Sequence, residues 1–122
     1  MRKSLKKLAT LHKPIYITEN GIPDSDDNQR PRALILHLHK VWQMLQNNLP
    51  LKGYYHWTLT DNFEWAEGWS LRFGLIALNP ETQQRMRRPS ADLYAVIAKG
   101  NAITPELITA YAPELQKVLF PE

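Results

Sequence analysis

Glu19 stands where a short β-branched segment ends. Residues 15–18 (Ile-Tyr-Ile-Thr) have the composition of a strand, and the Asn20-Gly21 dipeptide directly after Glu19 predicts a turn. In α/β folds catalytic groups stand at the carboxyl ends of strands, so a carboxylate here could act on a bound substrate. Exposed glutamates are common on protein surfaces, however, and residue type alone favours a surface glutamate beside a turn.

Aromatic, acidic and amide residues alternate in a second segment, between positions 57 and 69. Tryptophan faces stack on the C–H faces of sugar rings, while carboxylates accept hydrogen bonds from sugar hydroxyls. The mixture suits a carbohydrate ligand, although core tryptophans and loop-capping acids would leave the same pattern. The residues concerned are Trp57, Asp61, Asn62, Phe63, Glu64, Trp65, Glu67 and Trp69.

Patterns typical of metal and phosphate sites are incomplete in this sequence. The acidic run at 24–28 begins like a calcium loop, but Gln29 stands where that loop needs glycine and Ile35 where its closing glutamate belongs. His37 and His39 are two apart on a predicted helix and face different directions. The sequence has no cysteine and no glycine-rich phosphate loop. We therefore expect no metal and no cofactor.

The elements that must position these residues alternate between helix and strand. This order is typical of βα units on a parallel sheet. Two strands alone leave both edges of a sheet unpaired, so we expect the chain to pair with something or to be a piece of a larger fold. The predicted elements are a basic amphipathic helix over 1–13, a strand over 15–18, a helix from 31 to 46, a strand over 54–59, a long aromatic loop over 60–72, a strand or extended return over 73–78, a helix over 90–99 capped by Ser90, and a short helix from 104.

The basic charge of the chain is concentrated in one segment. The 122 residues carry a net charge of +3, but five basic residues and no acid lie within positions 1–13, and the remainder has a net charge of −2. A solvated helix is the default interpretation of this segment; a membrane-surface or transit segment and a nucleic-acid arm are the alternatives. Because the basic charge lies in this one segment, we expect no nucleic-acid partner. We also expect no membrane partner and a cytoplasmic protein, because no signal peptide and no long apolar run occurs.

Five motifs resemble glycoside hydrolase family 1, the β-glucosidase and β-glycosidase family. They occur in family order and with family-like spacing from about residue 14 to residue 100, and residues 101–122 are similar to a C-terminal extension in one branch of the family. The motifs are Ile15-Tyr16-Ile17-Thr18-Glu19-Asn20-Gly21, Gly53-Tyr54-Tyr55-His56-Trp57, Asp61-Asn62-Phe63-Glu64-Trp65-Ala66-Glu67-Gly68, Leu71-Arg72-Phe73-Gly74-Leu75 and Arg88-Pro89-Ser90-Ala91.

The resemblance implies an α/β fold, the eight-stranded (β/α) TIM barrel. Residues 14–100 would then supply barrel strands seven and eight with their helices, between the basic helix over 1–13 and the extension over 101–122. The chain would be a single partial domain over residues 1–122, the C-terminal part of the barrel and incomplete by itself.

The resemblance also implies roles for five residues. Glu19 would be the nucleophile that forms a covalent glycosyl-enzyme, which water cleaves with retention. Trp57 would form the floor of the sugar subsite, Glu64 would hold the outer hydroxyls, Trp65 would donate its indole N–H to a hydroxyl, and Phe73 would line the pocket. Because an anionic Glu64 would repel a phosphate, the expected substrate is a terminal, non-phosphorylated β-D-glucoside or β-D-galactoside.

The family's general acid/base lies in a Thr-x-Asn-Glu-Pro motif, and no Asn-Glu-Pro occurs in this sequence. Retaining chemistry needs two carboxyls about 5–5.5 Å apart, whereas the family motif puts Glu64 at the far edge of the sugar, so Glu64 does not replace the acid. We expect the chain to be inactive alone, with an N-terminal barrel fragment or a second copy of itself as partner. The alternative is a non-catalytic carbohydrate-binding or interaction module.

Overall fold

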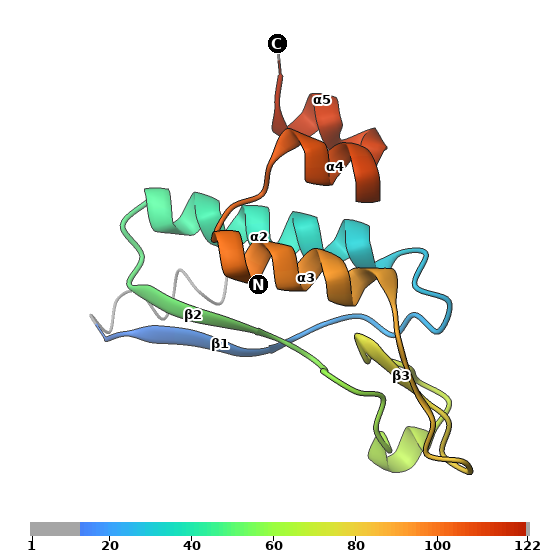
Figure 1. Cartoon of the computed structure of the whole chain (residues 1–122). Coiled ribbons are helices and arrows are strands. Elements are labelled where there is room, and N and C mark those ends of the chain that lie inside the picture. The colour runs from blue at the N-terminus through green and yellow to red at the C-terminus, as the bar shows by residue number, and fades with distance from the viewer. Residues whose placement is uncertain (1–12, 122) are drawn as a thin grey trace.

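A parallel βαβ unit forms the centre of the structure. The computed structural model describes residues 13–121, so nearly all of the predicted basic helix over 1–13 lies outside the described residues. Strand β1 (Ile15–Asn20) and strand β2 (Leu51–His56) run parallel, and helix α2 (Arg30–Gln46) crosses between them over one face of the sheet (Figure 1). The prediction of an α/β fold is confirmed.

The two faces of this sheet differ because side chains alternate along a strand. Ile15 and Leu51 are paired across the strands and pack on Met44 of α2, forming a small apolar cluster. An irregularity in the register after Leu51 resets this alternation in β2, so that Tyr55 shares the exposed face of Tyr16, opposite to these residues. The helix side of the sheet is therefore covered within the described chain, and the tyrosine side is open.

The main core lies between the helices. Helix α3 (Pro89–Gly100) packs beside α2, and the C-terminal elements α4 (Pro105–Tyr111), η2 (Pro113–Leu115) and α5 (Gln116–Leu119) pack on the far side of these two helices (Figure 1). The apolar periodicity of α2 and α3 turns one stripe of each helix inward. The buried residues of this core are Leu34, Ile35, Leu93, Ile97, Ile108, Ala112 and Leu115.

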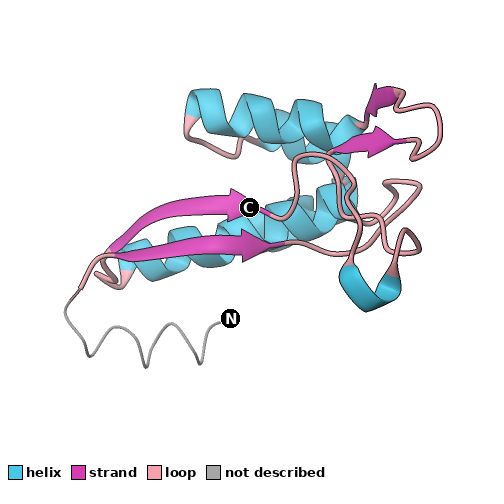
Figure 2. Cartoon of the chain, turned by 90° about the horizontal axis from the view of Figure 1, so that it is seen from below, coloured by secondary structure: helices cyan, strands magenta, loops and turns pink. Residues whose placement is uncertain are grey.

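A long excursion connects β2 to α3. It contains the short helix η1 (Trp65–Glu67) and an antiparallel hairpin of β3 (Ile76–Leu78) and β4 (Arg85–Arg87). Seen from below, β1 and β2 point the same way and the excursion gathers beyond their arrowheads (Figure 2). The loop after each strand thus lies at the same end of the sheet.

Three of the predicted element boundaries are wrong. The strand expected over 54–59 runs from Leu51 to His56 instead, because beyond Trp57 the backbone turns to Phe73, whose carbonyl accepts from the N–H of Thr58 at 3.3 Å. Of the strand or extended return predicted over 73–78, only 76–78 forms a strand, and its partner strand over 85–87, exposed and without apolar alternation, was not predicted. Arg88 occupies the N-cap position of α3, and Ser90 bonds to Asp27 instead of capping the helix.

Candidate functional site

Glu19 and Trp57 lie at the same edge of the sheet. Asn20 pairs with His56 across the parallel strands, and the N–H of Trp57 donates to the carbonyl of Asn20 at 3.0 Å, which extends the pairing by one residue. Glu19 directly precedes Asn20, and its side chain is exposed. The two residues that the sequence assigned to two different motifs are therefore neighbours across the strand ends.

Trp57 and Glu64 are in direct contact. The indole Nε1–H of Trp57 donates to Oε1 of Glu64 at 3.1 Å, and both side chains are half-buried. The backbone of Glu64 is held in turn, because its N–H donates to the carbonyl of Gly68 at 2.7 Å across the short helix η1. The carboxylate of Glu64 is thus oriented from both sides, by the neighbouring indole and by its own turn.

The structure does not bring Trp65 into this pair. Its backbone is in the left-handed region with a φ of 50°, and its side chain is 85% exposed. Phe73 is half-buried, and its carbonyl accepts from the N–H of Thr58, the residue after Trp57. The sugar contacts that the family resemblance assigns to Trp57, Glu64, Trp65 and Phe73 stay predictions.

A second aromatic pair lies in the same loop. Beside it lies an arginine to which the sequence analysis gave no role. Phe63 and Trp69 meet edge to face, with 6.1 Å between their ring centroids. The guanidinium of Arg72 lies over the Trp69 ring at 5.5 Å from its centroid. Because cations are attracted to the faces of indole rings, this contact holds the Arg72 side chain against Trp69, three residues earlier. Phe63 itself is 55% exposed.

A buried ion pair fixes the base of the loop. The guanidinium of Arg88 donates to both carboxylate oxygens of Asp61, at 3.0 and 3.1 Å, and Asp61 also accepts from the N–H of Gly74 at 2.8 Å. Burial by itself would raise the pKa of Asp61, but the hydrogen bonds from Arg88 and Gly74 outweigh burial and hold that pKa below its usual value. The 27 residues that separate the partners explain why the sequence did not reveal the pair.

The acidic run at 24–28 orders the loop after β1. One carboxylate oxygen of Asp24 accepts from the N–H groups of Gln29 and Arg30 at 2.8 and 2.7 Å, at the start of α2. Burial raises the pKa of Asp24, but these backbone hydrogen bonds prevail and leave it lowered. Asp27 pairs with the fully buried Arg30 and accepts from both the N–H and the hydroxyl of Ser90 at 2.7 Å. Within residues 13–121, no three histidine, aspartate or glutamate side chains gather as metal ligands.

His56 is a neutral histidine between the strand end and the helices. Its ring lies 6.1 Å from that of Tyr94 and its Nε2 is 3.4 Å from the carbonyl oxygen of Phe73. Burial lowers the pKa of His56 to about 4, so the ring is uncharged at neutral pH.

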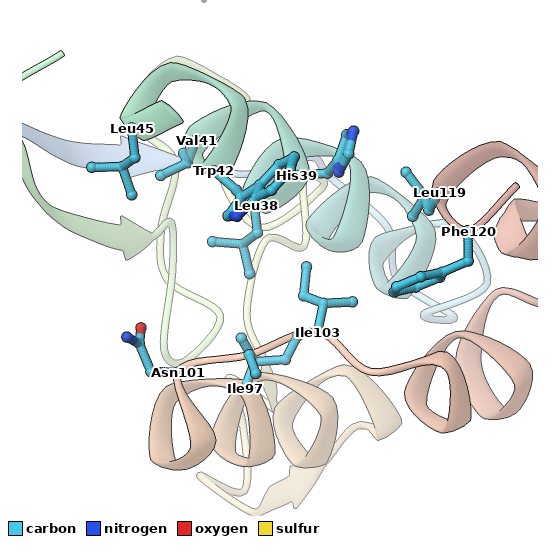
Figure 3. A pocket seen from close by; sticks show the side chains of 11 residues that line it. Leu38, His39, Val41, Trp42, Leu45, Ile97, Asn101, Ile103, Leu119 and Phe120 are labelled. Atoms are coloured by element: carbon cyan, nitrogen blue, oxygen red, sulfur yellow. The ribbon is translucent and has the colours of Figure 1, made fainter. Parts of the chain in front are cut away.

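An apolar groove of about 460 Å³ lies away from the strand ends. Leu38, Val41, Trp42 and Leu45 on the second half of α2 face Ile97, Ile103 and Phe120 across it (Figure 3). Because α2 returns antiparallel to β1, this half of the helix stands beside the beginnings of the strands. The groove therefore belongs to a different end of the molecule from Glu19 and Trp57.

Comparisons with known proteins agree on one family. The model of glycosyl hydrolase family 1 matches residues 1–103. A β-galactosidase of Saccharolobus solfataricus is 45% identical over 96 residues, which are 79% of this chain and 20% of that enzyme. β-Glucosidase A of Thermotoga maritima is 39% identical over 110 residues, 81% of this chain and 25% of that enzyme.

The solved structures give the same result. The β-glycosidase from Pyrococcus horikoshii superposes with a TM-score of 0.85 at 42% identity, covering 93% of this chain and 27% of that one. This chain belongs to glycosyl hydrolase family 1, whose fold is the TIM barrel. It spans about a fifth to a quarter of the length of the curated relatives cited above. None of the helices in the described part of the chain is long and apolar enough to cross a membrane.

Proposed function

We propose that this chain is the C-terminal portion of a retaining β-glycosidase and carries its nucleophile, Glu19. The observation that supports this most directly is the position of Glu19 at the end of β1, next to the Trp57–Glu64 pair at the end of β2. In TIM-barrel enzymes the active site is built from the carboxyl ends of the strands and the loops that follow them. In this proposal β1 and β2 are barrel strands seven and eight.

The proposed chemistry begins with attack of the Glu19 carboxylate on the anomeric carbon of a β-glycoside. A carbon–oxygen bond to Glu19 forms as the bond to the aglycone breaks, and water later cleaves the glycosyl ester with retention of configuration. Trp57 and Phe73 would contact the sugar ring, Glu64 would accept from its outer hydroxyls, and Trp65 would donate to a hydroxyl. The substrates are terminal, non-phosphorylated β-D-glucosides or β-D-galactosides, because the carboxylate of Glu64 would repel a phosphate.

The chain alone should not hydrolyse such a substrate. Protonating the leaving group and activating water require a second carboxyl near Glu19, and the 122 residues contain no Asn-Glu-Pro motif to provide it. General acid–base catalysis is worth about 10²–10⁴-fold. We propose that the working partner is a fragment carrying the first six βα units of such a barrel.

A trapping experiment separates the nucleophile from the missing acid. A 2-deoxy-2-fluoro-β-glucosyl fluoride has a leaving group that needs little protonation, and its C2 fluorine slows hydrolysis of the glycosyl ester. When the chain is mixed with the six-unit fragment, mass spectrometry should find one glycosyl group on Glu19. The same mixture should hydrolyse an aryl β-glucoside, whereas each part alone should not.

Two variants make this test specific. Glu19→Gln should abolish both trapping and turnover, because a neutral amide is a very poor nucleophile. Glu81→Gln, which alters an exposed acid between β3 and β4, should leave both unchanged. Turnover by the chain alone that survives Glu19→Gln would overturn the proposal.

The exposed aromatic surface favours a second candidate, a carbohydrate-binding module that does no chemistry. Trp65 and Phe63 present aromatic faces at the strand end without help from another chain. If this candidate is right, the chain alone binds a β-linked glucose oligosaccharide with a change in tryptophan fluorescence, and the six-unit fragment adds no turnover. Fluorescence titration of the chain and of Trp65→Ala distinguishes the two functions.

A further inference from the structure

The first residues of α3 contact both loops of the proposed active site. Arg88 donates to the carbonyl of Ser25 in the loop after β1 at 3.1 Å and to Asp61 in the loop after β2. Ser90 donates to Asp27 in the first loop. Neither loop has to be held by a bound ligand, because both are anchored to the start of the same helix.

We propose that Arg88 is a positioning residue of this site: through Asp61 it fixes the loop after β2 so that Trp57 and Glu64 face the strand end that carries Glu19. The inference rests on the proposed function for its catalytic meaning. Arg88 itself is 8% exposed and lies at the base of the loop, so its role does not include contact with the sugar.

Hydrogen bonds, together with short stretches of backbone between them, connect Arg88 to Thr58, the residue after Trp57. Arg88 donates to the carbonyl of Gly74 at 2.6 Å, and the N–H of Gly74 donates to Asp61 at 2.8 Å. The next residue, Leu75, donates its N–H to the carbonyl of Thr58 at 3.0 Å. Thr58 directly follows Trp57, and Glu64 is three residues beyond Asp61, so a shift at Asp61 moves both members of the Trp57–Glu64 pair.

The planar guanidinium is essential to this arrangement. Arg88 bonds simultaneously to two oxygens of Asp61 and to the carbonyls of Gly74 and Ser25. A lysine ammonium is a compact charge on a flexible stem and does not reproduce this fork. Arg88→Lys therefore keeps the charge and changes only the geometry.

The preceding residue supplies a matched control. Arg87 pairs with Asp92, and both of these side chains are more than half exposed. Arg87→Lys makes the same chemical change one position earlier, in a pair that orders no part of the two loops. Exposed pairs of this kind contribute little to stability or geometry.

The decisive experiment labels the full chain with 5-fluorotryptophan and records its ¹⁹F spectrum, assigning the four tryptophans by single Trp→Phe variants. We expect Arg88→Lys to move the Trp57 resonance by more than its linewidth and to leave that of Trp42, on α2, in place. Arg87→Lys should move neither. Asp61→Asn, which keeps the shape of the partner, should reproduce the Trp57 shift.

Each other outcome overturns the proposal. An unmoved Trp57 resonance in Arg88→Lys means that the ion pair does not position the indole. An equal shift of the Trp42 resonance, or the collapse of all four tryptophan resonances to similar chemical shifts, means that Arg88 stabilises the fold in general. No catalysis enters this spectrum, so its outcome is independent of the trapping experiment on Glu19.

A kinetic measurement on the mixture with the six-unit fragment adds the catalytic consequence. If Arg88 positions groups that hold the sugar, Arg88→Lys should raise KM for an aryl β-glucoside about tenfold with kcat nearly unchanged. A fall in kcat at unchanged KM would contradict this role. If the mixture is inactive with both the original and the variant chain, the proposed function fails, and the ¹⁹F result still decides whether Arg88 positions Trp57.

Discussion

At the carboxyl ends of β1 and β2, charged side chains are buried in pairs, whereas at the other end of the helix layer apolar side chains surround an open groove. Arg30 with Asp27 and Arg88 with Asp61 hold the loops of the first region. In the second region Trp42 remains 53% exposed beside the groove. The difference indicates that buried ion pairs hold the loops of the strand-end region, whereas the groove is lined mainly by apolar side chains.

We expect the largest loss of stability in the strand-end region from a substitution of Asp27. Asp27→Ala would leave the guanidinium of Arg30 buried without its carboxylate and remove the acceptor of Ser90. Breaking a buried pair from one side costs about 3–5 kcal/mol. Urea unfolding of the variant and of the original chain, compared at the same protein concentration and oligomeric state, measures this loss of unfolding free energy.

The neighbouring acid Asp26 is the control for that measurement. It is exposed and accepts a hydrogen bond from the exposed Asn28. Asp26→Ala should unfold within about 0.5 kcal/mol of the original chain. If Asp26→Ala and Asp27→Ala unfold at the same urea concentration, the strand-end region does not depend on its buried pairs.

The dependence of stability on pH tests His56, which ends β2 in the strand-end region. Its folded pKa of about 4 is below the ordinary value of 6.5, so the folded state binds the proton less well than the unfolded state. The free energy of unfolding should therefore fall as the pH is lowered from about 6.5 toward 4, and level off for this group below 4. His56→Asn should flatten this part of the profile.

The other titrating groups shape the same profile in known directions. The pKa values of His37 and His39 are lowered by burial, so these residues retain part of the fall in His56→Asn. Asp24 and Asp61, whose pKa values lie below the ordinary 3.8, contribute stability above that pH and lose it only at lower pH. An unchanged profile in His56→Asn would show that the ring is not held neutral by the fold.

The smallest effect is expected at the C-terminal helices. Arg32 on α2 and Glu114 on η2 form an ion pair at 3.3 Å with both side chains about half exposed. Glu114→Gln should lower the free energy of unfolding by about 0–1 kcal/mol, and added salt should shrink the difference. A loss as large as that of Asp27→Ala would mean that charge pairing holds the helix layer as it does the strand ends.

Local patterns predicted the parts of the fold that depend on neighbouring residues. The β-branched run before Glu19 and the apolar stripe of α2 defined a βα unit, and the family motifs connected Glu19 with Trp57 and Glu64. Contacts between residues far apart in the sequence could not be predicted from it, because nothing next to Asp61 in the chain indicates Arg88 as its partner. The prediction of a Ser90 cap was wrong for the same reason. A serine before a helix predicts an N-cap, but the hydroxyl of Ser90 donates instead to Asp27, which is distant in sequence.

The close approach of Gly21 to Trp57 sets a limit on redesign of this chain. A Cβ at position 21 would lie 1.8 Å from the carbonyl oxygen of Trp57, whereas a Cβ at Gly100 would meet nothing within 4 Å. A library that varies both glycines should recover folded members with many residues at position 100, and with glycine alone at position 21. Gly21, in the turn after Glu19, is therefore a position that protein engineering cannot vary without moving the backbone of β2 away from β1.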